Sequence, residues 1–392
     1  MNITAFVSSH YEELITLIKT LAVIPAPSHH EERRATFCRD WMRKYIADNA
    51  LIDEANNAVC ELGDPDAPAV LLMAHTDIVF DETVELAVTE REGRLYCPGI
   101  GDDTAHVAIL LMCGQYLASQ PLPKGVRFIL AANTCEEGEG NLKGCRALMA
   151  RYGPQLSEVI TLDGYLDTLN DRAVGSKRYR IAVDTAGGHS FRDFGCDNAI
   201  AVAAELIGAL SAAELPSEHI TTFNFGCIEG GTTVNSIASH CEFTYEFRAD
   251  HSDNLRYMTA RFEDTLRPFA ERVRLTVTDL GVRPCADGVD PARQERLIAR
   301  TEAAFEGITH LRRYPASTDA NLPLSMGIPA VCIGCVRGGG AHTEEEYIES
   351  ASLKDGLTAA LRLAASYLKD SDIRPNGRVI WPLRDRDIHA DA

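Results

Sequence analysis

The sequence lacks the features of a membrane or exported protein. None of its apolar stretches is long enough to span a bilayer, and its first residues contain neither the basic block nor the apolar block of a signal peptide. Positive charge is also scarce, because 38 lysines and arginines face 57 aspartates and glutamates, for a net charge of −19. Nucleic acids and anionic membranes would be repelled and are excluded as partners. We expect a cytoplasmic protein.

A disulfide framework is lacking too, although the chain has twelve cysteines. Cys113, Cys135, Cys332 and Cys335 lie in apolar stretches, where a free thiol packs as a small apolar side chain. This pattern is typical of a reducing compartment. Cys332 and Cys335 form a C-x-x-C inside a predicted strand, and no second pair with zinc-ribbon spacing accompanies them, which argues against a ribbon or a redox motif.

What the chain does have is length and apolar content. Its 392 residues, 45% of them apolar, allow a large core and suggest two domains. We expect an α/β domain with a mixed, mostly parallel sheet, formed by residues 1–177 and 287–392, and a smaller α+β domain inserted at 178–286. The polar tail at 370–392 is expected to be loosely ordered.

The spacing of apolar residues predicts the individual elements. Expected helices cover residues 11–21, 31–46, 105–117, 198–210, 256–267 (ended by Pro268), 292–306 and 353–369. Buried strands are expected at 126–132, 158–162 and 330–336, and half-exposed strands at 179–184, 241–247 and 273–280.

The most informative stretch is residues 69–77, an apolar run that ends in His75-Thr76-Asp77. Such a run predicts a strand buried on both faces, with His75 and Asp77 at its carboxyl end, where ligands bind in open α/β sheets. Other predicted strands and one turn before a helix also end in polar side chains: Glu136 and Glu137, Asp163, His342, and Asp102. Histidines and carboxylates thus converge on one edge.

This convergence predicts a site for two divalent cations. A bridging carboxylate offsets the repulsion between two cations and leaves room for a shared water, and we assign that place to Asp102. His75, Asp163, Glu137 and His342 supply the remaining ligands. Imidazole and carboxylate ligands suit zinc, with cobalt or manganese as alternatives.

Three further carboxylate roles follow from the same stretches. Asp77 is expected to accept the second ring N–H of His75 and so to orient the ring. Neighbouring carboxylates at a strand end can point in different directions. We therefore assign Glu137 as a metal ligand and Glu136 as the general base. In that role Glu136 takes a proton from a metal-bound water and passes it to the leaving amine. Each motif alone is usually structural; their joint placement carries the prediction.

The ordered motifs resemble the family of two-metal exopeptidases and amide hydrolases that includes peptidase T, carnosinase, glutamate carboxypeptidase and aminoacylase. The matching segments are His75-Thr76-Asp77, Gly99-Ile100-Gly101-Asp102-Asp103, Glu136-Glu137-Gly138, Asp163-Gly164 and His342-Thr343-Glu344-Glu345-Glu346-Tyr347. The resemblance covers nearly the whole chain. It implies a zinc-exopeptidase-like catalytic domain, an inserted lid through which two subunits dimerise, and the same ligands and base.

The resemblance also implies functional residues in the lid. His189, in Gly187-Gly188-His189-Ser190, is similar to a histidine that stabilises the tetrahedral oxyanion, often across a dimer. Asn235 lies in a segment that resembles a substrate-holding loop, and Arg248 resembles an arginine that binds a substrate carboxylate through its two-pronged guanidinium. Without the resemblance, His189 would be taken for a surface turn histidine.

Some positions depart from the family pattern. Thr104 replaces a common lysine, His106 occupies a usually small position, and Phe191 replaces the glycine that commonly follows the lid His-Ser. Metal binding is expected to survive these changes, because none is a ligand position. His106 is expected to be a packed or hydrogen-bonded histidine rather than a ligand.

The expected activity is metal-dependent hydrolysis of short peptides by an exopeptidase, a di- or tripeptidase or an aminopeptidase. Within the family that the chain resembles, an aspartate at the position of Asp163 goes more with peptidases of this kind than with deacylases. The alternatives are an N-acyl amino acid amidohydrolase and, from another class, a non-catalytic metal- or peptide-binding relative.

Overall fold

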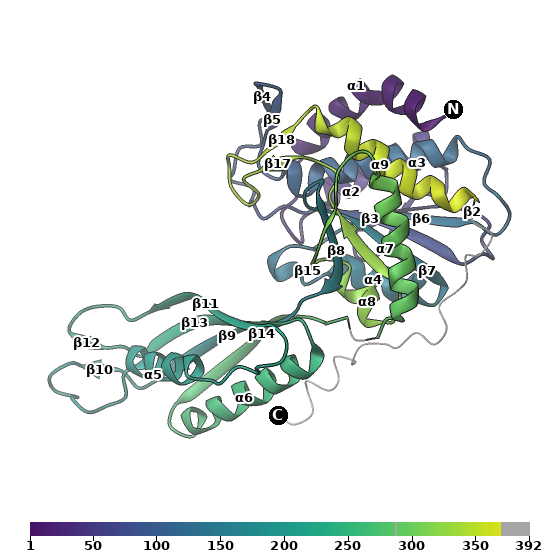
Figure 1. The fold of residues 1–392 in the computed structure, drawn as a ribbon. Coiled ribbons are helices and arrows are strands. Elements are labelled where there is room, and N and C mark those ends of the chain that lie inside the picture. Colours follow the sequence, from purple (N-terminus) through teal and green to yellow (C-terminus); the bar gives the residue numbers. More distant parts are fainter. Residues whose placement is uncertain (287, 370–392) are drawn as a thin grey trace. The chain divides into compact units, whose positions relative to one another are not determined.

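The computed structural model describes residues 1–286 and 288–369, and the tail expected to be loosely ordered at 370–392 lies outside that range. The chain divides into two compact units (Figure 1). Unit 1 consists of residues 1–173 and those from Gly288 on, and unit 2 of residues 174–287. Each unit is described by itself.

Unit 1 is built on an eight-stranded sheet with the order β1-β2-β6-β3-β7-β16-β8-β15. The strands are β1 (Leu51–Ile52), β2 (Ala58–Gly63), β3 (Ala69–His75), β6 (Arg127–Asn133), β7 (Leu156–Leu162), β8 (Thr168–Ala173), β15 (Arg312–Ala316) and β16 (Ala330–Ile333). The central strands β6, β3, β7 and β16 are mutually parallel, whereas β2 and β8 run antiparallel to their neighbours β6 and β16. The predicted mixed, mostly parallel α/β sheet is confirmed.

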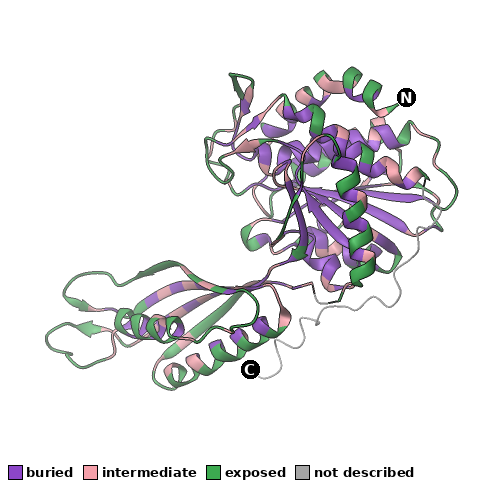
Figure 2. Ribbon diagram, in the orientation of Figure 1, coloured by how far each residue is buried: buried purple, intermediate pink, exposed green. Residues whose placement is uncertain are grey.

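Helices and short helical turns surround this sheet. The helices of unit 1 are α1 (Ile3–Ala22), α2 (Glu32–Tyr45), α3 (Ala105–Ala118), α4 (Lys143–Tyr152), α7 (Pro291–Phe305), α8 (Asn321–Ser325) and α9 (Ser352–Ser366). The short turns are η1 (Ile100–Thr104), η2 (Gly138–Gly140), η3 (Gly153–Gln155) and η4 (Tyr367–Lys369). All seven residues of β3 are buried, as expected for a strand covered on both faces (Figure 2).

A second, small sheet in unit 1 has the order β17-β18-β5-β4. Its strands are β4 (Thr89–Arg91), β5 (Arg94–Tyr96), β17 (Gly338–Gly339) and β18 (Tyr347–Glu349). Arg91 stacks on the ring of Tyr96 at 4.0 Å, and Arg94 on the ring of Tyr347 at 4.4 Å. The contact between Arg94 and Tyr347, together with the pairing of β5 and β18, fastens the segment that follows His342 to the strand that precedes the Asp102 turn.

Unit 2 is an antiparallel sheet of order β11-β13-β9-β14 with two helices packed on one face (Figure 1). Its elements are β9 (Gly175–Asp184), β10 (Gly188–His189), α5 (Ala199–Ser211), β11 (Thr221–Gly230), β12 (Ser236–Ile237), β13 (His240–Ala249), α6 (Ser252–Ala270) and β14 (Arg274–Arg283). Every second residue of β13, from Cys241 to Ala249, is buried in the core that includes residues of α5 and α6. The α+β pattern of this unit agrees with the sequence.

Three predicted helix boundaries are wrong, and one of them is the start of α6, which begins at Ser252 rather than at Arg256. Pro268 does not end α6, which continues to Ala270, because a proline in the last turn removes only one backbone donor while Glu271 N–H still reaches Arg267 O at 3.3 Å. The first helix begins at Ile3 rather than at Tyr11, since Asn2 accepts the N–H of Ala5 and caps it. Among residues 1–286 and 288–369, no helix is long and apolar enough to cross a membrane.

Candidate metal centre

The side chains that the sequence predicts as metal ligands lie together at the carboxyl edge of the main sheet. β3 ends at His75, β7 leads directly into Asp163, and the turn after β6 carries Glu136 and Glu137. Possible ligand atoms of three groups of residues lie within 4.8 Å of one another: His75, Asp102 and Asp163; His75, Glu136 and Glu137; and Asp102, Glu137 and His342. All six residues belong to unit 1.

Asp102 occupies the middle of this cluster. Its Oδ1 lies 3.1 Å from His75 Nε2, and its Oδ2 lies 3.1 Å from His342 Nε2. The same His342 nitrogen is 3.0 Å from Glu137 Oε1. One carboxylate therefore faces both histidines, with one oxygen directed at each.

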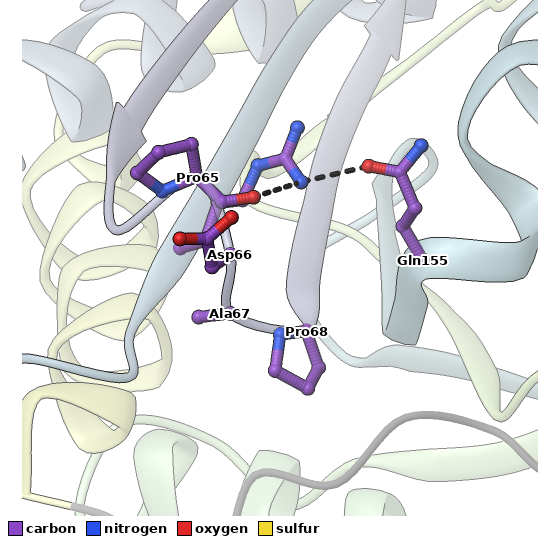
Figure 3. Close-up of a pocket in the computed structure, with 6 residues that line it drawn as sticks. Pro65, Asp66, Ala67, Pro68 and Gln155 are labelled. Atoms are coloured by element: carbon purple, nitrogen blue, oxygen red, sulfur yellow. Dashed lines mark hydrogen bonds between the residues drawn. The ribbon is translucent and has the colours of Figure 1, made fainter.

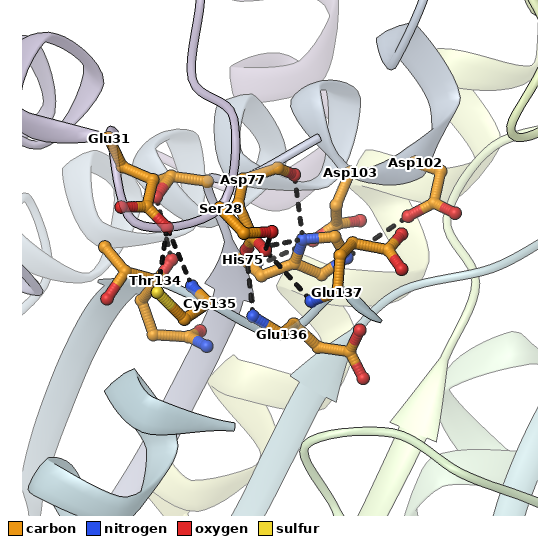
Figure 4. Close-up of polar contacts among 12 residues, drawn as sticks. Ser28, Glu31, His75, Asp77, Asp102, Asp103, Thr134, Cys135, Glu136 and Glu137 are labelled. Atoms are coloured by element: carbon orange, nitrogen blue, oxygen red, sulfur yellow. Dashed lines mark hydrogen bonds and ion pairs between the residues drawn. The ribbon is translucent and has the colours of Figure 1, made fainter. Parts of the chain in front are cut away.

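Asp77 connects several of the segments that form the site (Figure 4). It is fully buried, and its carboxylate accepts hydrogen bonds from Ser28 Oγ at 2.8 Å and from the N–H groups of Glu136 and Glu137 at 2.9 Å each. His75 Nδ1 lies 3.4 Å from Asp77 Oδ1 and 3.1 Å from the Asp77 carbonyl oxygen. Asp77 thus contacts both the ring of His75 and the turn that carries the paired glutamates.

The turn that carries the paired glutamates is held from a second side by Glu31. Glu31 Oε1 accepts the N–H groups of Cys135 and His29 at 3.0 and 3.1 Å, and the Cys135 thiol at 3.1 Å. Beyond Cys135, the Glu136 and Glu137 side chains leave the turn in different directions (Figure 4). Both carboxylates are nevertheless close to His75.

The pKa values of the cluster reflect burial and crowded charge. Burial raises the pKa of Asp163 well above its usual range, and Asp102 and Asp103 raise it further. Burial also raises the pKa of Glu137, although its contact with His342 opposes the shift. Contacts with Asp102 and Glu137 raise the pKa of His342 to about 10. The site therefore concentrates negative charge that divalent cations would stabilise.

The residues present fit a pair of divalent cations. His75 Nε2 is buried, lies 3.1 Å from Asp102 Oδ1 and is surrounded by further carboxylate oxygens. Imidazole nitrogens and carboxylate oxygens are the donors that zinc binds, and the second nitrogen of a ligand histidine is usually held by a carboxylate or a carbonyl group. Asp102 shares one group of possible ligand atoms with Asp163 and another with Glu137 and His342.

Besides Glu31, two further residues around the site were not predicted to contribute to it. Glu346 is buried, and its carboxylate accepts the N–H groups of Gly99, Gly101 and Asp102. Burial raises the pKa of Glu346 to about 7. Arg34 is buried below the site and donates to the carbonyl oxygens of Thr76 and Ile24 at 2.9 Å each. The sequence signal for Glu346 was its place in the His342 motif, but the motif does not reveal its partners.

His106 is a buried, hydrogen-bonded histidine. Its Nε2 accepts the N–H of Cys335 at 3.0 Å, so the neutral ring carries its proton on Nδ1, which lies 3.1 Å from Gly101 O and 2.6 Å from Asp103 Oδ1. Burial lowers the pKa of His106. This residue joins the Asp102 turn to the end of β16.

The remaining predicted residues lie in unit 2. His189 is exposed, and its Nδ1 accepts the N–H of Phe191 at 3.2 Å, which leaves the proton of the neutral ring on Nε2. Asn235 is adjacent, because its carbonyl oxygen accepts the N–H of Ser190 and β10 pairs with β12. Arg248 lies toward the far end of β13, where its Nε and Nη2 donate to the two carboxylate oxygens of Glu246 at 3.1 and 3.2 Å.

A surface pocket elsewhere in unit 1 contains none of these residues (Figure 3). It is lined by Pro65, Asp66, Ala67, Pro68, Arg127 and Gln155. The Arg127 guanidinium donates hydrogen bonds to Pro65 O, to Gln155 and to Glu61. The charged group of this pocket is therefore used in contacts within the protein.

Comparison with known proteins gives consistent matches. A family model described as peptidase family M20/M25/M40 matches residues 71–366. An acetylornithine deacetylase from Photorhabdus laumondii is 28% identical over 230 residues, which cover 54% of this chain and 58% of that relative. The chain therefore matches little more than half the length of this curated relative.

Solved structures share the fold over nearly their whole length. A tripeptidase from Staphylococcus aureus superposes with a TM-score of 0.74 at 21% identity, covering 92% of this chain and 99% of that chain. A dinuclear metal-binding peptidase of the M20 family from Bacillus subtilis superposes with a TM-score of 0.63 at 16% identity, with the same coverage.

Proposed function

The chain belongs to peptidase family M20/M25/M40, a family of metal-dependent hydrolases, and on that premise we propose that it hydrolyses amide bonds of short peptides as an exopeptidase. The observation that carries the proposal is the cluster of two histidines and four carboxylates at the carboxyl edge of the main sheet. Such a cluster can hold two cations and still keep one carboxylate for proton transfer.

Five residues would hold the cations in this proposal. His75 and Asp163 would contribute to one site, Glu137 and His342 to the other, and Asp102 to both. The two groups of neighbouring ligand atoms that share Asp102 support this division. Bound divalent cations would polarise the scissile carbonyl group and lower the pKa of a water molecule. Zinc is the proposed metal, with cobalt or manganese as alternatives.

Glu136 is the proposed general base and acid. It is 6% exposed, is close to His75 and Glu137, and has its backbone N–H fixed by Asp77. In this role its carboxylate takes a proton from the attacking water and returns it to the leaving amine. Asp77 maintains the position of the turn and the orientation of the His75 ring.

Residues of unit 2 are proposed to bind the substrate. Because His189 keeps its neutral-ring proton on Nε2, it can donate a hydrogen bond to the oxyanion of the tetrahedral intermediate. Asn235 is proposed to hold the peptide, and Arg248 its carboxylate, for which the guanidinium would exchange Glu246 for the substrate. Dimerisation through unit 2 and a cytoplasmic location, which suits twelve free thiols, complete the proposal.

A second function deserves a direct comparison. The acetylornithine deacetylase relative favours an N-acyl amino acid amidohydrolase, which would use the same metal centre on a different acyl group. Asp163 favours the peptidase, since the resemblance associates an aspartate at that position with di- and tripeptidases and aminopeptidases.

The test is a substrate panel with defined metal content. Metal-free protein is reconstituted with zinc, cobalt or manganese and assayed on dipeptides, tripeptides and N-acyl amino acids, with Glu136→Gln as the matched variant. We expect peptide hydrolysis by the reconstituted wild type, and a loss of at least about 100-fold in kcat with unchanged metal content in Glu136→Gln.

Other outcomes are equally informative. Cleavage of N-acyl amino acids alone would replace the peptidase by the amidohydrolase. Full turnover by Glu136→Gln would remove Glu136 from its role as base, and two bound cations without turnover on either substrate class would support a non-catalytic relative.

A further inference from the structure

Glu346 has an unusual set of partners for a buried acid. Its side chain is 1% exposed, and its Oε2 accepts the N–H of Gly99 at 2.7 Å. Its Oε1 accepts the N–H groups of Gly101 and Asp102, also at 2.7 Å each. A carboxylate that accepts several short bonds from backbone donors holds those donors firmly, because charge-assisted hydrogen bonds are about twice as strong as neutral ones.

The turn is shaped to wrap around this carboxylate. A Cβ on Gly101 would lie 3.0 Å from Glu346 Oε1 and 3.3 Å from Ile348 Cγ2, so a side chain at this position would push the turn or the carboxylate away. Gly99 has φ +70°, a left-handed conformation that glycine adopts without strain. Gly101 therefore leaves room for Glu346, and Gly99 supplies the left-handed backbone of the turn, from which its N–H donates to Glu346.

The backbone of Glu346 is held as tightly as its side chain. Glu346 O accepts the N–H of Cys97 at 3.1 Å, and Glu346 N–H donates to Thr343 O at 3.2 Å. Thr343 directly follows His342. One residue thus connects the turn that carries Asp102 with the loop that carries His342, although the two are more than 200 residues apart in the sequence.

We propose that Glu346 is a positioning residue that fixes Asp102 relative to His342, so that both side chains can engage the same cation. Glu346 does not contact the cation itself, because both of its oxygens are directed at the backbone of residues 99–102. The inference rests on the ligand roles proposed for Asp102 and His342.

The test compares Glu346→Gln with Glu345→Gln, the same substitution at the neighbouring, exposed residue, which contacts Arg91. Glutamine keeps one acceptor oxygen and places an NH₂ group against a backbone N–H, so it cannot satisfy all three donors. In the full chain, zinc content is measured by mass spectrometry of the metal across a series of buffered free-zinc concentrations. Kinetic constants are then measured at saturating zinc.

For Glu346→Gln we expect the free zinc needed to load the second cation to rise about 10- to 100-fold, and kcat to fall by a similar factor while KM stays within about twofold. Glu345→Gln should match the wild type in all three quantities. A variant Glu346→Gln with wild-type zinc loading and wild-type kcat would overturn the proposal.

Two further variants keep the result interpretable. Glu346→Asp retains the charge but is one methylene shorter. If Glu346→Gln does not fold, the same measurements on Glu346→Asp test the proposal instead. Failure of both variants to fold would overturn the proposal and assign Glu346 a purely structural role. Asp102→Asn separates the two hypotheses. Wild-type zinc loading in Asp102→Asn would contradict the proposed ligand set, whereas a loading defect there and none in Glu346→Gln would contradict only the positioning role.

Discussion

Single carboxylates outside the proposed ligand set determine where the ligands stand. Asp77 contacts the His75 ring and accepts the N–H groups of both Glu136 and Glu137, so one buried side chain sets the positions of a histidine and a glutamate from different strands. Glu31 does the same for Cys135, the residue before the paired glutamates. The ligands and the residues that orient them therefore form one network.

This network predicts that Asp77→Asn weakens metal binding without removing a ligand. An asparagine places an NH₂ group where Ser28 Oγ or a backbone N–H now donates, so at least one donor loses its acceptor. We expect a loss of about 10- to 100-fold in metal affinity, measured by competition with a zinc chelator of known affinity. Ser28→Ala, which removes only one of these bonds, should change the affinity much less; an equal loss in both variants would contradict the central role of Asp77.

The pKa of His342 gives a prediction for the metal-free protein. Contacts with Asp102 and Glu137 raise its pKa to about 10, from an unfolded value of about 6.5. A raised histidine pKa means that the protonated ring stabilises the fold fully below about pH 6.5 and that this contribution is lost as the pH rises toward 10. Urea unfolding of metal-free protein should thus show a midpoint that falls across this range, and the fall should be smaller in His342→Gln.

The sequence could predict which side chains gather at the site, and that Asp77 lies beside His75, but not the contacts of Glu346 and Glu31. His75, Glu137 and Asp163 each follow a recognisable buried strand, and the carboxyl ends of parallel strands meet at one edge. Glu346 and Glu31 bind backbone N–H groups 245 and 104 residues away, at Gly101 and Cys135. Every residue except proline has a backbone N–H, so the sequence does not indicate which of these groups will bind a distant acidic side chain.

At the scale of elements, apolar pattern identified most of the long segments, but it missed α4 and β11, each of ten residues, and the short or polar strands. β3, β6 and β7 are largely apolar and lie within two residues of their predicted bounds. β8 and β15 contain Asn170, Asp171 and arginines that form ion pairs across the sheet edge, so their composition resembles that of loops. The strands of the small sheet have two or three residues, which is too few for a period to be recognised.

Close packing of a helix against a strand end gives a prediction at this scale. A Cβ on Gly356, in α9, would lie 1.6 Å from the carbonyl oxygen of Cys335, so Gly356→Ala must separate α9 from the end of β16. We expect a net destabilisation of about 1–3 kcal/mol, the usual cost of overpacking. The measurement is chemical unfolding of unit 1, followed by Trp41 fluorescence.

The matched control is the same substitution in a helix with open space. Gly208, in α5, has no atom within 4 Å of an added Cβ and is exposed. Gly208→Ala should therefore stabilise unit 2 by about 0.5–1 kcal/mol, through the better helix propensity of alanine. Stabilisation by Gly356→Ala as well would show that α9 can move away from Cys335 at little cost.

At the scale of the whole molecule, each of the two units has a hydrophobic core of its own among the described residues. One surrounds α3, α9 and the main sheet, and the other lies between the unit 2 sheet and its helices α5 and α6. In the sequence, the stretch of unit 2 contains alternating apolar patterns, whereas the strands of unit 1 around the site are mostly apolar runs. Since each unit has its own core, their stabilities can respond separately to a ligand.

Removal of the metal should change the stability of unit 1 and leave that of unit 2 unchanged. All five proposed ligands belong to unit 1, so a cation that binds the folded state adds about 2.7 kcal/mol to unit 1 at a hundredfold excess over its dissociation constant. For a unit of this size that corresponds to a rise of roughly 5–10 °C in its unfolding midpoint. Hydrogen exchange of the full chain, with zinc or with a chelator, should show slower exchange with zinc in β3, β6 and β7. The exchange of β9 and β13 in unit 2 should be the same in both conditions, and equal protection of both units would mean that they unfold as one cooperative body.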